Sequence, residues 1–166
     1  MSVVRYTFDV VGPLACPDRG AGPAGIAIDS FHAGRDAAAI RALVDDCRDS
    51  RGGMAAGLNA AGLLGECSPR PGRDVLVSLA RIDGVQPAGM VTLTVAGSGE
   101  SRRFSIGWLV VSPVARRRGV ATALVHHALT QARHAGAAVV HVETRESWAD
   151  AEAFWRSLDG RCRRQD

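Results

Sequence analysis

Residues 107–124 read GWLVVSPVARRRGVATAL, and they divide into an apolar strand, a basic loop and the start of a helix. The strand is rich in apolar and β-branched residues, and Pro113 ends it because proline has no N–H group to donate to a ladder. After Gly119 the apolar residues recur at helical spacing, with Val120 and Leu124 in one row. The pattern predicts a strand, a tight loop and an amphipathic helix.

The loop between strand and helix has the features of a diphosphate-binding site. The first N–H groups of a helix have no intrahelical partner and carry partial positive charge, so they suit a phosphate. Gly119 lacks a side chain that would hold a diphosphate away from the backbone, and Ala121 is small. The spacing is neither the dinucleotide fingerprint nor a Walker loop, which needs Gly-Lys-Ser/Thr, and the chain contains no lysine. The alternative is an ordinary strand–helix turn with solvated arginines.

The pattern Val111-x-Pro113-x-x-Arg116-x-x-Gly119-x-Ala121 resembles the acyl-CoA motif of the GCN5-related N-acetyltransferase (GNAT) family. As an order of elements, the resemblance covers residues 29–160. It implies an α/β fold, in which helices flank a mixed, mostly antiparallel sheet. It also implies transfer of an acetyl group from acetyl-CoA to an amine acceptor by direct attack. A non-catalytic acyl-CoA-binding module is the alternative function.

The resemblance also implies roles for backbone groups. The family's pantetheine arm pairs with the central strand, and a backbone N–H of that strand, here Val110 or Val111, stabilises the thioester oxyanion. The diphosphate lies on the amides at the helix start. The residues implied to bind acetyl-CoA are Leu109, Val110, Val111, Arg116, Arg117, Arg118, Gly119, Val120, Ala121 and Thr122.

The side-chain roles of the family carry over less completely. Ser105 stands where many members have a glutamate base, and Trp155 stands where many have a tyrosine acid. Trp155 and Trp148 are interpreted as packing residues. Glu143 is the candidate base, and the competing interpretation is a solvated carboxylate or an ion pair with Arg145.

Length and composition fit one soluble domain. The chain has 166 residues and a formal net charge of +3 with neutral histidines, which suits an acidic ligand without implying nucleic acid. A nucleic-acid-binding reading, suggested by the arginines of 116–118 and 161–164, lacks interleaved aromatic residues. No apolar run is long enough for a membrane span, so the expected location is the cytoplasm. The four cysteines form no C-x-x-C pair, so no metal site is expected.

Outside the central stretch, the pattern predicts further strands and helices. Residues 1–25 are expected to form an extra strand (3–11) and a Gly/Pro-rich linker that precede the acetyltransferase-like domain of residues 26–166. Asp36 is expected to cap a helix over residues 37–47. A second helix is predicted near residues 54–64. Later elements are the strands at 75–81, 86–95, 104–111 and 138–144, a helix from Gly119 to Gly136, and a helix over 147–158.

The end of the chain departs from the family pattern. Only six residues follow Gly160, where the family continues with a strand hairpin that covers the strand matching residues 138–144. That hairpin is expected to be missing, which would leave an exposed sheet edge. One hypothesis is that the strand at 3–11 covers this edge. The alternatives are a second subunit, as in a homodimer, or a truncated and weakened version of the fold.

Overall fold

Seven strands and four α-helices make up the part of the chain that the structure describes. The structure is a computed structural model, and it describes residues 3–11, 25–49, 60–68, 70–84, 86–145, 148–158 and 162–165. The strands are β1 (Val3–Asp9), β2 (Ile26–Ser30), β3 (Arg73–Ile82), β4 (Pro87–Ala96), β5 (Arg103–Val111), β6 (Val139–Arg145) and β7 (Cys162–Gln165). The helices are α1 (Ala33–Asp49), α2 (Ala60–Glu66), α3 (Val120–His134) and α4 (Ala149–Ser157). The predicted linker, the first residues of the second predicted helix, and Ser147 before the last helix lie outside the described residues.

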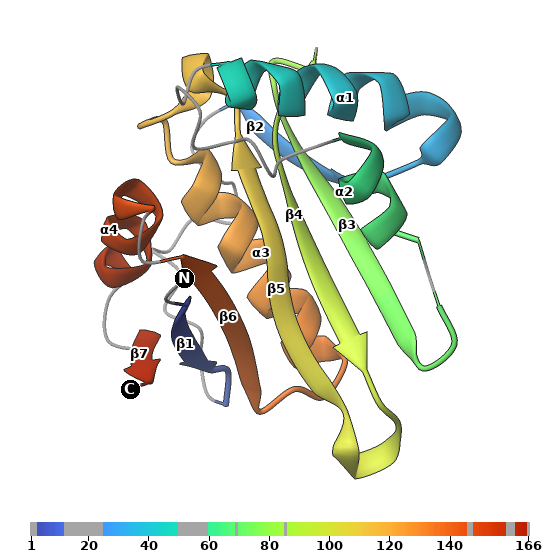
Figure 1. Cartoon of the computed structure of the whole chain (residues 1–166), viewed down its shortest axis with the longest axis vertical. Coiled ribbons are helices and arrows are strands. Elements are labelled where there is room, and N and C mark those ends of the chain that lie inside the picture. Colours follow the sequence, from blue (N-terminus) through green and yellow to red (C-terminus); the bar gives the residue numbers. More distant parts are fainter. Residues whose placement is uncertain are drawn as a thin grey trace.

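All seven strands belong to one mixed sheet, in the order β2-β3-β4-β5-β6-β1-β7 (Figure 1). Strands β2 to β5 are antiparallel neighbours, and β3, β4 and β5 form the predicted meander. Residues 97–102, which join β4 to β5, include a short 3₁₀ helix (Gly99–Ser101). Strand β6 runs parallel to β5 because α3 crosses over between them. The expected α/β fold with a mixed, mostly antiparallel sheet is confirmed.

The edge beyond β6 is covered by both ends of the chain. Strand β1 pairs antiparallel with β6 over its full length, from Val3 opposite Arg145 to Asp9 opposite Val139. This confirms the hypothesis that the N-terminal strand covers this edge. A second strand, β7, pairs with the outer side of β1 and was not predicted from the sequence. Two strands from opposite ends of this chain thus lie where the family pattern led us to expect a hairpin (Figure 1).

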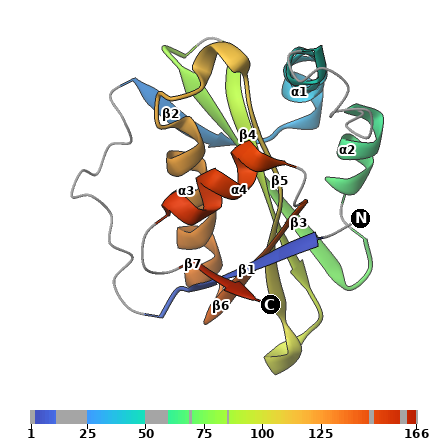
Figure 2. The same cartoon turned by 60° about the vertical axis from the view of Figure 1, so that its left-hand side comes forward.

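The helices divide between the two faces of the sheet (Figure 2). One face, which we call the back face, packs under α3 and α4 and holds the larger apolar cluster, including Phe8, Ile106 and Leu124. The other, the front face, packs under α1 and α2 with a second cluster that includes Ile40 and Val110. That second cluster contains no side chain from β6 or β1, so the front face of these strands has no helix packed on it among the described residues.

Helix α1 begins three residues before the predicted cap, so the prediction that Asp36 caps it is wrong. The Asp36 carboxylate lies inside the first turn, is 1% exposed, and accepts a hydrogen bond of 2.9 Å from the His32 N–H. Asp36 Oδ1 lies 2.7 Å from Arg35 Nε and 2.8 Å from Nη2 of Arg81, a residue of β3. The aspartate therefore ties α1 to the sheet.

Gly89 on β4 sits where β5 and α3 approach most closely. A Cβ added there would lie 2.9 Å from the Val110 carbonyl oxygen and 3.1 Å from side-chain carbons of Val120 and Leu124. We expect Gly89→Ala to destabilise the fold by about 2 kcal/mol, because a strand backbone cannot move aside as a side chain can. Urea unfolding measures this. Gly34→Ala in α1, whose added Cβ meets nothing within 4 Å, is the matched control and should be neutral or stabilising.

Candidate functional site

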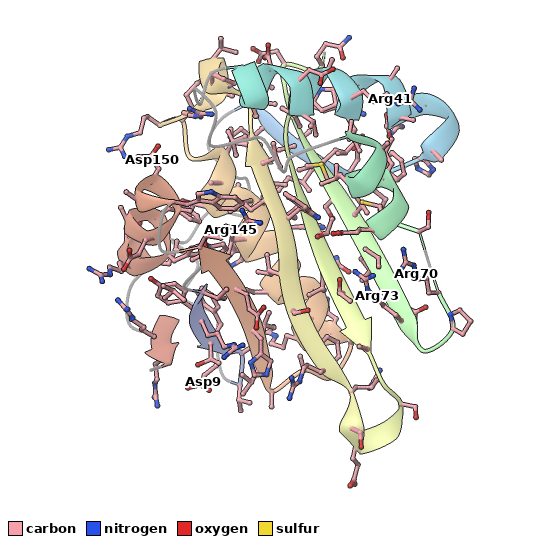
Figure 3. All side chains as sticks on the ribbon, in the orientation of Figure 1. Asp9, Arg41, Arg70, Arg73, Arg145 and Asp150 are labelled. Atoms are coloured by element: carbon pink, nitrogen blue, oxygen red, sulfur yellow. The ribbon has the colours of Figure 1, made fainter. Side chains whose placement is uncertain are left out.

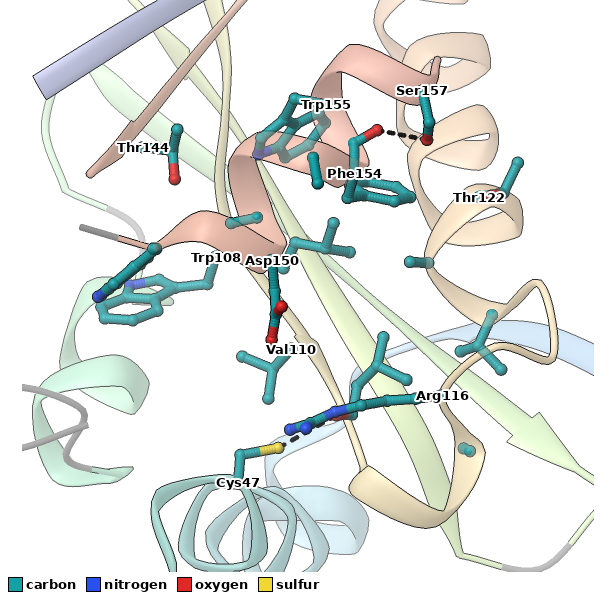
Figure 4. A pocket seen from close by; sticks show the side chains of 18 of the residues that line it. Cys47, Trp108, Val110, Arg116, Thr122, Thr144, Asp150, Phe154, Trp155 and Ser157 are labelled. Atoms are coloured by element: carbon teal, nitrogen blue, oxygen red, sulfur yellow. Dashed lines mark hydrogen bonds between the residues drawn. The ribbon is translucent and has the colours of Figure 1, made fainter. Parts of the chain in front are cut away.

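A cavity of about 680 Å³ opens at the end of β5 where that strand leaves β6. Strands β5 and β6 are paired only from Phe104 to Ile106, so the next residues of β5 face open space. The cavity is bounded by β5, the loop to α3, the first turn of α3, the end of β6, and α4 (Figure 4). All of the expected acetyl-CoA residues except Arg118 line it, and so does Glu143.

A bulge sets the direction of the β5 backbone at this cavity. Gly107 and Trp108 both lie opposite Thr92 of β4, and the Trp108 N–H donates to Thr92 Oγ1 at 2.8 Å. Beyond the bulge the Ser112 N–H donates to the Ala88 carbonyl oxygen at 2.9 Å. Hydrogen-bonded pairs alternate along an antiparallel ladder, so Val110 also points its N–H toward β4.

The intervening residues, Leu109 and Val111, therefore turn their N–H and C=O groups away from β4 and toward the cavity. A bond of 3.3 Å from Cys47 Sγ to the Val111 carbonyl oxygen agrees with that direction. Of the two expected oxyanion donors, Val110 does not fit this register and Val111 does. Leu109, expected only as a pantetheine contact, offers a second free N–H nearer to the point where β5 and β6 separate.

The opposite end of the cavity is the start of α3. Gly119 occupies the N-cap in a left-handed conformation with φ of 80°, which glycine adopts without strain. The first helical bond runs from the Ala123 N–H to the Gly119 carbonyl oxygen, so the N–H groups of Val120, Ala121 and Thr122 have no intrahelical acceptor. Arg116 and Arg117 line the cavity beside them. This end can bind a diphosphate.

Two carboxylates line the cavity, and only Glu143 was expected. The sequence offered Arg145 as an ion-pair partner of Glu143. In the structure Glu143 pairs instead with Arg5 of β1, whose Nε lies 2.9 Å from Glu143 Oε1. Arg145 instead stacks on Trp148, with its guanidinium carbon 5.2 Å from the ring centroid. The second carboxylate, Asp150, projects from the first turn of α4 (Figures 3 and 4). No motif in the sequence pointed to Asp150.

Three tryptophans surround the site. Trp155 is 4% exposed and makes edge-to-face contacts with Phe8 and Phe154, at centroid distances of 6.0 and 5.1 Å, so its predicted packing role is confirmed. Trp148 is the N-cap of α4. Trp108 lies on the front face, where its indole N–H donates to Glu66 of α2 at 2.6 Å. These rings make the cavity wall largely apolar.

Two buried cysteines, Cys47 and Cys67, form no disulfide, and Cys47 lines the cavity. Burial raises the pKa of Cys67 to about 11.

No group of three or more His, Cys, Asp or Glu suited to a metal occurs within the described residues. In the same part of the chain, no helix has the length and apolar character needed to cross a membrane.

Comparison with known proteins bears on this site. Residues 63–159 match a family model described as the acetyltransferase (GNAT) family. A comparison with curated proteins found no match. At the sequence identities given below, the solved structures show the fold alone.

Three solved structures illustrate the likeness. A tandem GNAT protein from the clavulanic acid biosynthesis pathway, solved without AcCoA, has a TM-score of 0.71 at 19% identity, over 98% of this chain and 50% of that one. A GCN5-related N-acetyltransferase from Sphaerobacter thermophilus has a TM-score of 0.67 at 20% identity, over 98% and 48%. An aminoglycoside acetyltransferase from an uncultured soil metagenomic sample has a TM-score of 0.63 at 17% identity, over 82% and 88%. The chain thus spans about half the length of the first two.

Proposed function

The chain belongs to the acetyltransferase (GNAT) family, and from that premise we propose that it transfers an acetyl group from acetyl-CoA to an amine. One observation carries the proposal. The cavity connects the backbone groups of Leu109 and Val111 that point away from β4 with the N–H groups at the start of α3 that have no intrahelical acceptor. These are the two ends of a site for a thioester joined to a diphosphate.

The residues present fit acetyl-CoA along this line. The N–H groups of Val120, Ala121 and Thr122, with the side chains of Arg116 and Arg117, suit the diphosphate. The amides of the pantetheine arm can pair, as an added strand would, with the N–H of Val111 and with its C=O, which has a second lone pair beside the one that accepts from Cys47 Sγ. Leu109, which is farthest from the diphosphate end, is then the donor nearest to the thioester oxygen. We therefore assign the oxyanion role to the Leu109 N–H.

The reaction needs few further groups. The neutral amine nitrogen attacks the thioester carbon, and the charge that develops on the oxygen is stabilised by the Leu109 N–H. The C–N bond forms, the C–S bond breaks, and CoA leaves as its thiolate. A thiolate with a pKa of about 8.5 leaves without an acid, so the tryptophan at position 155 need not prevent turnover. The proton lost from the amine passes to Glu143, the lining carboxylate nearest to the separation of β5 and β6.

Two measurements test the proposal in sequence. Isothermal titration of acetyl-CoA into the protein should show binding at a single site. A thiol-release assay with a panel of primary amines should then show CoA formation that depends on the amine. Binding without release with any amine would favour the alternative, a non-catalytic acyl-CoA-binding module. That alternative is motivated by Ser105 at the family's base position and by the buried Trp155. If acetyl-CoA does not bind, both the proposed acetyl transfer and the non-catalytic alternative are wrong.

Glu143→Gln should lower kcat by about 100-fold and leave the affinity for acetyl-CoA unchanged, because a neutral amide cannot take the amine proton. Steady-state rates and acetyl-CoA titration measure the two effects. Asp150→Asn removes the other lining carboxylate and is the control. A larger loss of kcat in Asp150→Asn than in Glu143→Gln would move the base to α4 and contradict the assignment.

A further inference from the structure

The front face beside the cavity carries charged side chains and no packed helix in the described part of the chain. Side chains alternate along β1 and β6, so the buried residues Val4, Tyr6, Val140 and Val142 lie on the back face. Arg5 and Glu143 are direct register partners and lie together on the front face. Because Glu143 also lines the cavity, this surface continues directly from the reaction site.

The Arg5–Glu143 ion pair is exposed to solvent, so a bound ligand can replace either residue as the partner of the other. Arg5 Nε lies 2.9 Å from Glu143 Oε1, and the two side chains are 64% and 63% exposed. No other bond to either side chain occurs in the described residues, so both Nη groups of Arg5 and Oε2 of Glu143 are available. Exposed pairs of this kind contribute about 0–1 kcal/mol to stability, so a ligand can displace the contact at small cost.

Adjacent opposite charges complement a ligand with the same arrangement reversed. An α-amino acid carries its amino group and its carboxylate on one carbon atom. The guanidinium of Arg5 can bind the carboxylate through two parallel N–H bonds. Glu143 can at the same time accept a hydrogen bond from the amino group and then take its proton.

The surrounding charges disfavour the main competing class, polycationic amines. Two carboxylates, Glu143 and Asp150, line the cavity, and so do Arg116 and Arg117. Arg5 lies beside Glu143, and Arg145 stacks on the lining residue Trp148, so two further positive charges border the cavity. A ligand with several ammonium groups would meet more arginines than available carboxylates.

We propose that the acceptor is a free α-amino acid, whose amino group is bound by Glu143 and whose carboxylate is bound by Arg5. This inference rests on the proposed acetyl transfer and adds the substrate class. It also gives the N-terminal strand a direct part in the site, since Arg5 belongs to β1.

The test compares matched acceptors. Wild-type protein with acetyl-CoA is assayed for CoA release with each of the twenty common L-amino acids and with the amine left when the carboxylate is removed, such as L-phenylalanine and phenethylamine. At least one amino acid should have kcat/KM at least tenfold above its decarboxylated partner. Arg5→Gln should raise KM for that amino acid about tenfold or more and change kcat little. The kcat/KM for the decarboxylated amine should stay the same. Arg5→Lys should recover part of the affinity.

Arg163→Gln is the matched control. It removes an exposed arginine of β7 that pairs with Asp9, at the end of β1 remote from Arg145 (Figure 3). Arg163→Gln should leave kcat/KM unchanged for the amino acid and for its decarboxylated amine. Decarboxylated amines that react as well as the amino acids, or equal effects of the Arg5 and Arg163 variants, would overturn the inference and leave the proposed function intact. Failure of acetyl-CoA to bind would instead reject the proposed function, and the inference with it.

Discussion

Replacing Gly119 with glutamate is expected to lower the affinity for acetyl-CoA by more than about 100-fold. Gly119 is the N-cap of α3 at φ of 80°, directly before three N–H groups without intrahelical acceptors. A glutamate side chain would fill the space for the diphosphate and repel its charge. The left-handed backbone conformation would cost a further 1–3 kcal/mol or so of stability. Isothermal titration with acetyl-CoA measures the binding, and urea unfolding measures the stability.

The control for this variant is Gly136→Glu at the other end of the same helix. Gly136 also has a positive φ, 89°, and an added Cβ would meet only the end of the flexible Arg102 side chain, at 3.4 Å. Gly136→Glu should therefore lose similar stability while keeping acetyl-CoA affinity. If the two variants lose binding equally, the loss comes from a damaged helix and the assignment of the diphosphate end is wrong.

Asp36→Ala is expected to destabilise the fold by about 3 kcal/mol. The substitution leaves Arg81, whose side chain is only 15% exposed, without its bond to a carboxylate that is itself buried. Removing one partner from a buried ion pair typically costs about 3–5 kcal/mol. The greater exposure of Arg35, and the contact that Arg81 Nε keeps with Asp29 Oδ2 at 3.2 Å, place this case at the lower end. Asp74→Ala, which removes an exposed aspartate of β3, is the control and should cost less than about 1 kcal/mol.

The Asp36 effect should depend on pH with a definite sign. The hydrogen bonds from Arg35, and then those from the His32 N–H and Arg81, hold the pKa of this carboxyl well below its ordinary value of 3.8. A group whose folded pKa is depressed stabilises the fold above its unfolded pKa and loses that contribution as pH falls. The difference in unfolding free energy between wild type and Asp36→Ala should thus be constant above about pH 5 and shrink below about pH 4. A difference that grows on acidification would contradict this account.

The elements that could be predicted from the sequence are those whose signals are local. The strand of β5, the loop and α3 follow one another within a single stretch, and the left-handed Gly119 and Gly136 frame the helix. The placement of β1 could be predicted because an uncovered edge beside β6 needed a partner. Strand β7, with only four residues, was too short to give a pattern, and it forms because β1 offers it an edge.

The backbone part of the site was predictable for a similar reason, and the side-chain part was not. Any sequence that makes this strand and helix directs N–H groups at the cavity, but which residues of β5 do so depends on a bulge visible only in the register, which turns Leu109 and Val111, and not Val110, away from β4. The Arg5–Glu143 pair joins residues 138 positions apart in the chain. The role of Asp36 was not predicted because one of its partners, Arg81, lies on a strand beyond the second helix.

The position of β1 between β6 and β7 has a consequence for how the protein folds. The meander and α3 are made of near neighbours in the chain and can form early, but β1 pairs with residues about 138 positions later. Contacts across such long loops slow folding, because loop-closure entropy must be overcome before the contact contributes. During synthesis at about 5–20 residues per second, β1 would wait several seconds for its partner, with an apolar face exposed. Completion of the sheet, and with it delivery of Arg5 to the site, is thus expected to be the last and slowest step of folding.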